Sequence, residues 1–247
     1  MSDFSGQTAV VTGGTRGLGR AIALDLLAHG ARVVATYRSD EDAAARLVEE
    51  SGGAGERLST ARFDVADSAA VAAFWERLEG ERESGVQILV NNSGIRRDAA
   101  LALMSEADWR AVLDTNLTGT FLMAKAAVRH MAGRRYGRIV NITSPSARHG
   151  FEGQSNYAAS KAGQVAMTRS LAREVARRKI TVNCVSPGFV DTELLADLSE
   201  EQKAAYRAGV PLRRFAEPQE IAYAVRALAS REASYITGTV LEVAGGL

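Results

Sequence analysis

The sequence predicts a single doubly wound α/β domain over residues 1–247, with a seven-stranded parallel sheet and helices on both of its faces. Short apolar, β-branched runs alternate with longer segments of helical periodicity, which is the pattern of repeated βαβ units. A glycine-rich turn directly follows the first of these runs. No linker, repeat or low-complexity tract divides the 247 residues, so one large core accounts for the chain.

The expected strands occupy residues 8–12, 32–36, 58–63, 87–91, 137–143, 180–186 and 239–243. Between them apolar residues recur at spacings of three and four, as in Ala21, Leu24, Leu27 and Ala28, which predicts helices that cover the sheet. Two long helices are expected at residues 108–132 and 156–178. Residues 191–218 are polar and helix-prone and follow a strand end, a position suited to a substrate lid.

Composition excludes several classes of protein. Thirty Lys and Arg against 29 Asp and Glu leave a net charge of +1, so no global field favours nucleic acid or an anionic membrane. The single cysteine, Cys184, excludes an internal disulfide and lies in an apolar run that indicates a buried strand. Three His without a close pair argue against a metal site. With no leader pattern and no long apolar span, a cytoplasmic protein is expected.

The glycine-rich turn is the first candidate binding site. It runs Thr12-Gly13-Gly14-Thr15-Arg16-Gly17-Leu18-Gly19 and leads into a helix. At such a junction a dinucleotide pyrophosphate binds, because glycines let the backbone approach and the helix N-terminus presents unpaired N–H groups. Gly13, Gly17 and Gly19 are the expected working positions, flanked by Thr15, Arg16 and Leu18. The alternative is a glycine-rich turn that binds no ligand.

The end of the second expected strand indicates which dinucleotide is bound. An NAD site usually has an acidic residue there, but Ala35-Thr36-Tyr37-Arg38-Ser39 contains no carboxylate before Asp40. Arg38, with Arg16 and the hydroxyls of Thr36 and Ser39, could bind a 2′-phosphate through charge-assisted hydrogen bonds. NADP(H) is therefore the predicted cofactor. The alternative is that both arginines are solvated loop residues.

Tyr157 and Lys161 form the candidate catalytic pair. They are four residues apart in a helical segment and so share one face of that helix. An ammonium beside a phenol favours the phenolate and lowers the pKa of the phenol, which suits acid/base work near neutral pH. Ser144 lies 13 residues upstream, just after an expected strand, where its hydroxyl could bind a substrate carbonyl.

Over nearly its full length the chain resembles the short-chain dehydrogenase/reductase family, which has the Rossmann fold, and is most similar within it to bacterial 3-oxoacyl-acyl-carrier-protein reductases. The matching positions are the turn from Thr12 to Gly19, Asp64-Val65, Asn91-Asn92-Ser93-Gly94, Asp114-Thr115-Asn116, Ser144, Tyr157, Lys161, Pro187-Gly188, Tyr235-Ile236-Thr237-Gly238 and Gly245-Gly246. Ser93, Ala244 and Pro145 depart from the family pattern, and Pro145, directly after Ser144, leaves the acyl chain of the substrate open.

The resemblance implies a role for each matching residue. Tyr157 would be the proton donor, and Lys161 would lower its pKa and hold the nicotinamide ribose. Ser144 would orient the carbonyl, and Asn116 would position a water near Lys161. The remaining implied cofactor contacts are Asp64 and Val65 at the adenine, Asn91 and Gly94 at the ribose, and Pro187, Gly188, Val190 and Thr192 at the nicotinamide amide. Two structural interpretations stay open, in which Asn116 merely satisfies a helix bend and Asp64 is an ordinary residue at the end of a strand.

The resemblance also implies the substrate and partners. The expected reaction is NADPH-dependent reduction of a 3-oxoacyl thioester on acyl carrier protein, in fatty-acid or polyketide synthesis. Arg129 and Arg173 resemble carrier-docking residues, and further candidates are Arg96, Arg97, Arg134, Arg135, Arg148 and His149, any of which could instead be a solvated surface residue. A homotetramer through the two long helices is expected. The alternatives are an alcohol or sugar dehydrogenase of the same family and a non-catalytic, cofactor-binding regulatory protein.

Overall fold

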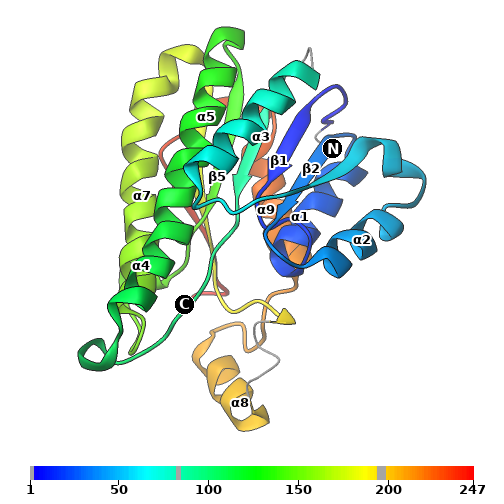
Figure 1. The fold of residues 1–247 in the computed structure, drawn as a ribbon. Coiled ribbons are helices and arrows are strands. Elements are labelled where there is room, and N and C mark those ends of the chain that lie inside the picture. The colour runs from blue at the N-terminus through cyan, green and yellow to red at the C-terminus, as the bar shows by residue number, and fades with distance from the viewer. Residues whose placement is uncertain (1–2, 82–84, 194–198) are drawn as a thin grey trace.

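The computed structural model describes residues 3–81, 85–193 and 199–247 and confirms the predicted fold class (Figure 1). The sheet is parallel throughout, in the order β3-β2-β1-β4-β5-β6-β7. The strands are β1 (Thr8–Val11), β2 (Arg32–Tyr37), β3 (Leu58–Arg62), β4 (Ile88–Asn91), β5 (Gly137–Ile142), β6 (Ile180–Pro187) and β7 (Val240–Val243). Each agrees with its predicted run to within one residue at either end, because the buried apolar runs stop where the chain reaches the sheet edges.

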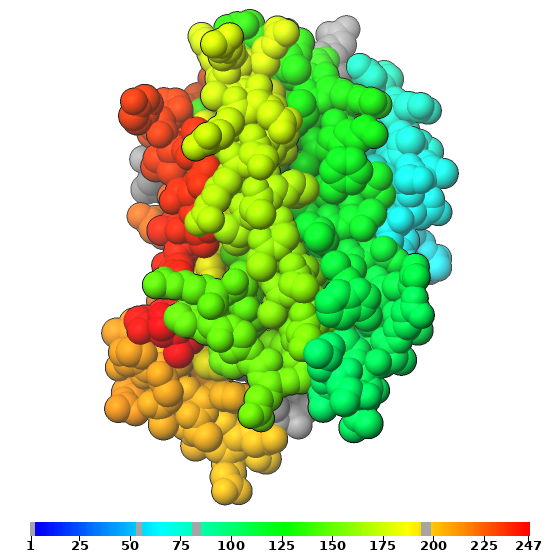
Figure 2. Space-filling view, turned by 90° about the vertical axis from the view of Figure 1, so that its left-hand side faces the viewer, coloured from blue at the N-terminus to red at the C-terminus, as the bar shows by residue number. Residues whose placement is uncertain are grey.

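Helices cover both faces of the sheet. They are α1 (Gly17–Ala28), α2 (Glu41–Glu50), α3 (Ser68–Glu81), α4 (Glu106–Leu113), α5 (Gly119–Arg134), α6 (Ser146–His149), α7 (Ser155–Val175), α8 (Glu200–Gly209) and α9 (Pro218–Ala229). Helices α1 and α9 pack together on one face, whereas α3, α5 and α7 contribute to the core on the other. Helices α7 and α4–α5 lie side by side on the surface shown in Figure 2.

The strands are buried on both faces, so neighbouring residues of one strand contribute to different cores. On β1, Val10 packs under α3 and α5, while Ala9 and Val11 pack under α1 and α9. Cys184 is fully buried in β6, as its apolar setting predicts. No helix among residues 3–81, 85–193 and 199–247 is long and apolar enough to cross a membrane.

The strand order reverses direction at β1, which pairs with both β2 and β4. In open parallel sheets ligands bind at the carboxyl ends of the strands beside such a switch point. The loops after β1, β4, β5 and β6 all emerge at this end. Helix α8 lies beyond the same end of the sheet, near the C-terminus (Figure 1). Part of the expected lid, residues 194–198, falls outside the described residues.

The long helix expected at residues 108–132 is not continuous. A π-helical turn, Asp114–Thr118, separates α4 from α5. Such a turn frees a backbone carbonyl, and that of Asn116 accepts hydrogen bonds from Thr120 Oγ1 at 2.6 Å and Gln164 Nε2 at 2.7 Å. The pattern of apolar residues does not reveal this interruption because the helical face continues through it.

Candidate active site

The glycine turn between β1 and α1 is shaped for close approach of a ligand. Gly13 and Gly17 have φ of +59° and +50°, which favours glycine. A Cβ on Gly19 would lie 2.0 Å from the carbonyl oxygen of Gly13, so no side chain fits there. No side chain of the described residues caps the N-terminus of α1. Its first N–H groups can therefore receive an anion such as a pyrophosphate, which fits the predicted cofactor.

Thr12 and Asn92 hold this turn against β4, a role that the sequence did not reveal. Thr12 Oγ1 accepts hydrogen bonds from the backbone N–H groups of Asn92 and Ser93, both at 3.0 Å. Asn92 Nδ2 donates to the carbonyl oxygens of Thr12 and Gly13, both at 3.1 Å. The two loops at the switch point are thus one hydrogen-bonded unit. The signal was present in the Asn91-Asn92 pair at the end of β4.

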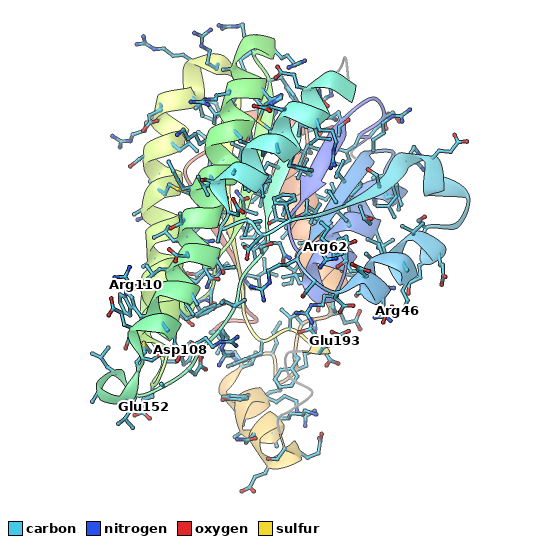
Figure 3. All side chains as sticks on the ribbon, in the orientation of Figure 1. Arg46, Arg62, Asp108, Arg110, Glu152 and Glu193 are labelled. Atoms are coloured by element: carbon cyan, nitrogen blue, oxygen red, sulfur yellow. The ribbon has the colours of Figure 1, made fainter. Side chains whose placement is uncertain are left out.

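The end of β2 carries the residues predicted to select the cofactor. Arg38 is exposed and lies 3.7 Å from Asp64, measured from Nη1 to Oδ2. Thr36 contributes its carbonyl oxygen, which accepts from Gly14 N at 2.9 Å, while its side chain is buried. Arg62 Nε donates to the carbonyl oxygen of Arg38 at 3.2 Å, and Arg62 and Arg46 lie on this side of the molecule (Figure 3). The exposed guanidinium of Arg38 is free to turn towards a phosphate at a small cost.

The other predicted cofactor contacts line the same sheet edge. Asp64 Oδ1 accepts from Ala66 N at 2.9 Å in a local turn, and Val65 is buried against Gly119 at the start of α5. Asn91 Nδ2 donates to Asn141 Oδ1 on β5 at 2.8 Å. A Cβ on Gly94 would lie 3.6 Å from Lys161 Nζ, so the loop after β4 passes directly over the catalytic pair.

The loop after β6 completes this edge. Gly188 N donates to the carbonyl oxygen of Val243 at 3.0 Å, and a Cβ on Gly188 would lie 2.8 Å from Ala244 Cα. Val190 forms an isolated parallel bridge with Ala216. The loop from Pro187 to Thr192 is therefore fixed to the C-terminal segment on one side and to the chain before α9 on the other.

Lys161 is buried and holds α7 to β5. Its Nζ donates to the carbonyl oxygen of Ile142 at 2.7 Å, and its own carbonyl oxygen accepts from Thr143 Oγ1 at 3.1 Å. Burial disfavours the ammonium and lowers the pKa of Lys161 from 10.5 to about 8. An ammonium has three donors, so Lys161 retains the capacity to bind ribose hydroxyls.

Tyr157 lies one turn before Lys161 on α7, as the four-residue spacing predicts. Lys161 Nζ is 5.6 Å from the centre of the Tyr157 ring. The pKa of Tyr157 is raised, chiefly by burial, although the hydrogen bond with Ser144 and the charge of Arg96 act in the opposite direction. This differs from the shift expected from Lys161, because desolvation of the phenolate outweighs the favourable interactions. At neutral pH Tyr157 is a phenol with a proton to donate.

Asn116 lies under this pair, fully buried in the π-helical turn. Its Oδ1 accepts from Ile95 N at 2.8 Å, and its Nδ2 donates to the carbonyl oxygen of Ile95 at 3.0 Å and to Ser160 Oγ at 3.2 Å. Both side-chain atoms therefore bind the loop after β4, and Nδ2 also binds α7. These bonds run to the loop after β4 and to α7 rather than to the helix bend, and they place Asn116 beside the catalytic pair.

Arg129 and Arg173 are exposed at one level of α5 and α7, away from the catalytic end. The contacts Asn116–Ser160 and Thr120–Gln164 join residues 44 apart, and Arg129 and Arg173 have the same separation. Thirteen residues of helix separate Ser160 from Arg173, a distance of about 20 Å at 1.5 Å per residue. The two arginines thus form a pair remote from Tyr157.

A cavity of about 340 Å³ adjoins the site but does not contain the chemistry. Phe189, Val210 and Leu212 line it together with the C-terminal residues. Its lining, within the described residues, includes none of Asn116, Ser144, Tyr157 and Lys161. We therefore place the reaction at the α7 end of the crevice, where the titratable groups meet.

Known proteins are similar to this chain in sequence and in the arrangement of helices and strands. Residues 13–247 match the family model described as Enoyl-(Acyl carrier protein) reductase. The chain is 45% identical over 245 residues to the 3-oxoacyl-[acyl-carrier-protein] reductase FabG of Escherichia coli (strain K12), covering 99% of this chain and 98% of that protein. It is 42% identical over 247 residues to Nodulation protein G of Rhizobium sp. (strain N33), covering 100% and 99%.

A solved structure gives the same result. The structure described as a "putative gluconate dehydrogenase" from Agrobacterium tumefaciens superposes with a TM-score of 0.94 at 34% sequence identity. The match covers 99% of this chain and 96% of that one.

The lowered pKa of Lys161 predicts a specific dependence of stability on pH. From pH 8 to 10.5 the unfolded chain keeps a proton on Lys161 that the folded protein has lost, so stability gains with rising pH. Relative to Lys161→Met, the wild type should gain about 3 kcal/mol of unfolding free energy between pH 7 and 10.5. Urea unfolding at both pH values measures this difference. A Lys125→Met control, at an exposed position of α5, should keep the gain, and an equal pH response of wild type and Lys161→Met would contradict the assignment.

Proposed function

The chain belongs to the short-chain dehydrogenase/reductase family, and we propose that it is an NADPH-dependent ketoreductase that converts a 3-oxoacyl thioester on acyl carrier protein to the 3-hydroxyacyl product. Membership of this family makes it an oxidoreductase. The observation that supports ketone reduction most strongly is the buried Lys161 one turn from a protonated Tyr157, at the switch point of the sheet. The relatives named as 3-oxoacyl-[acyl-carrier-protein] reductases support the substrate class.

In this reaction the chain's own residues bind the cofactor and handle the proton. The glycine turn and the N-terminus of α1 hold the pyrophosphate, Arg38 the 2′-phosphate, and Lys161 the ribose next to the nicotinamide. When bound, NADPH supplies the hydride. Tyr157 donates its proton to the carbonyl oxygen, and the Ser144 hydroxyl hydrogen-bonds the same oxygen as negative charge develops on it.

The charge states of the pair favour reduction over oxidation. A general acid must carry its proton, and the raised pKa keeps Tyr157 protonated at neutral pH. Lys161, with a pKa of about 8, is largely an ammonium below that pH and stabilises the phenolate formed when the proton leaves. Oxidation of an alcohol requires the phenolate from the start, which burial disfavours.

An alcohol or sugar dehydrogenase is the second candidate. The description of the structural relative, "putative gluconate dehydrogenase", favours it, and Asn116, Ser144, Tyr157 and Lys161 can also serve the reverse reaction. The assembled Ser144, Tyr157 and Lys161 argue against a non-catalytic regulatory protein. Initial rates with acetoacetyl thioesters and with sugar-like alcohols, each with NADPH/NADP and NADH/NAD, distinguish the three.

A carrier protein is the proposed partner. Arg129 and Arg173 present two positive charges to an acidic carrier. Because they lie about 20 Å of helix from the level of Tyr157, a carrier bound there reaches this site through a long substrate arm or serves a neighbouring protomer. We propose a cytoplasmic homotetramer paired through α4, α5 and α7, of which α4 exposes Trp109 and α5 exposes Phe121.

Removing the Tyr157 hydroxyl should abolish most turnover. Tyr157→Phe keeps the ring and its packing, so the fold and NADPH affinity should remain. The rate of NADPH oxidation with a 3-oxoacyl thioester should fall by a factor on the order of 10² or more, since the proton donor is lost. Near-normal activity of this variant would reject Tyr157 as the acid.

Cofactor choice should depend on Arg38. Arg38→Gln removes the charge proposed to bind the 2′-phosphate, and KM for NADPH should rise about tenfold or more, the effect of one charge-assisted hydrogen bond. KM for NADH should stay unchanged. Arg110→Gln, on α4 at the other side of the molecule (Figure 3), is the control. Equal effects on both cofactors would show that Arg38 does not select NADPH.

Carrier docking should depend on the remote arginine pair. Arg129→Glu with Arg173→Glu should weaken turnover of the carrier-bound substrate and spare a small soluble ketone, because the catalytic end is untouched. Arg32→Glu with Arg46→Glu, at exposed positions of β2 and α2, makes the same change of four in net charge and is the control. If carrier-bound and free substrates lose activity alike, the pair does not dock the carrier.

A further inference from the structure

A chain of hydrogen bonds leads from Tyr157 to a carboxylate at the mouth of the site. Tyr157 hydrogen-bonds Ser144, and Ser144 Oγ lies 3.2 Å from Ser146 Oγ. Ser146 Oγ lies 3.1 Å from Gln154 Oε1, and Gln154 Nε2 lies 3.1 Å from Asp98 Oδ2. The chain thus joins the loop after β4, α6 and the segment before α7. Neither the motifs nor the mechanism above accounts for Ser146, Gln154 or Asp98.

The carboxylate of Asp98 fixes the direction of the hydrogen bonds that join Gln154, Ser146 and Ser144. An ionised carboxylate only accepts, so the amide NH₂ of Gln154 faces Asp98 and its carbonyl oxygen faces Ser146. The Ser146 hydroxyl therefore donates to Gln154 and can only accept from Ser144. Ser144 in turn donates to Ser146. A second bond, from Ser146 N to Ser144 Oγ at 3.2 Å, holds the same oxygen.

Two hydrogen bonds to main-chain carbonyl oxygens hold the Asp98 end of the chain in place. Ala99 N donates to the carbonyl oxygen of Gly153 at 2.9 Å, and Asn156 Nδ2 donates to that of Arg97 at 2.9 Å. These bonds flank the contact between Asp98 and Gln154 on both sides. The amide of Gln154 consequently meets the carboxylate of Asp98 in a fixed register.

Arg96 closes the chain into a ring. Its guanidinium is ion-paired with Asp98, and its Cζ lies 6.0 Å from the centre of the Tyr157 ring. Ser146 is buried, whereas about a third of the Arg96 and Asp98 side chains is exposed. The ring therefore runs from the buried hydroxyls of the site to its solvent-facing entrance.

On the premise of the proposed function, we propose that Ser146, Gln154 and Asp98 are positioning residues that hold the Ser144 oxygen in one place beside Tyr157. Two hydrogen bonds with Ser146 fix that oxygen, so the Ser144 hydroxyl has only to turn its proton from Ser146 to the carbonyl oxygen when a substrate binds. Loss of the chain leaves Ser144 free to rotate. It should therefore lower kcat without changing the affinity for NADPH.

The test compares hydroxyl loss at two neighbouring serines. In Ser146→Ala, kcat for a 3-oxoacyl thioester should fall about tenfold, the order of one hydrogen bond, with the Kd for NADPH and the thermal midpoint unchanged. Ser146→Thr, which keeps the hydroxyl, should restore most of the rate. Ser155→Ala, at the first residue of α7 and outside the chain, should match the wild type. A kcat for Ser146→Ala within twofold of the wild type would overturn the proposal, as would parallel losses of kcat, NADPH binding and thermal stability.

Asp98→Asn gives an independent readout at an exposed position and decides the matter even where Ser146→Ala does not fold. An asparagine both donates and accepts, so it no longer fixes the Gln154 amide, and kcat should fall. The charge of Asp98 also raises the pKa of Tyr157, so its removal in Asp98→Asn should lower that pKa. The rate of alcohol oxidation, which rises with pH as Tyr157 ionises, should therefore begin to rise at a lower pH in this variant. An unchanged kcat, together with an oxidation rate that rises at the same pH as in the wild type, would overturn the proposal. If the wild type reduces the thioester and Asp98→Asn has the same kcat and pH dependence, only the role of the hydrogen-bond chain is rejected. If the wild type shows no NADPH-dependent turnover, the proposed function is rejected as well.

Discussion

The buried ammonium of Lys161 is the constraint on which the site depends. A charged group in the interior is costly unless hydrogen bonds satisfy it, and the carbonyl oxygen of Ile142 at 2.7 Å supplies one such bond. That bond ties α7 to the end of β5 and thereby sets where Tyr157, one turn earlier, meets the crevice. The same burial lowers the pKa of Lys161 to about 8, so the group remains an ammonium at neutral pH yet close to its titration range.

Buried polar contacts around Lys161 fix the positions of the loops at this end of the sheet relative to α7. The π-helical turn frees the carbonyl of Asn116 for Gln164 and Thr120, while its side chain binds Ile95 and Ser160. The loop after β4 is in this way bonded to α7 on one side and, through Asn92, to the glycine turn on the other. These bonds hold the loop after β4, α7 and the glycine turn in one arrangement, so a carbonyl placed over the crevice meets a fixed proton donor.

Local patterns in the sequence were sufficient for the fold and for the identity of the central pair. Apolar β-branched runs located every strand, and the four-residue spacing placed Tyr157 and Lys161 on one helical face. Long-range and desolvation effects were not accessible in this way. The raised pKa of Tyr157 arises from burial, and the contact of Gln154 with Asp98 joins residues 56 apart in sequence. Spacing within one helix carries no information on either.

The role of the Lys161 ammonium is measurable in the pH dependence of kcat/KM for NADPH during reduction of a 3-oxoacyl thioester, since this ratio reports ionisations of the free enzyme. We expect a plateau at neutral pH and a fall of about tenfold per pH unit above about 8, as Lys161 loses its proton. In Lys161→Arg, whose guanidinium stays charged, that limb should be absent from the residual activity. A wild-type profile that stays flat to pH 10 would contradict the role assigned to the buried ammonium.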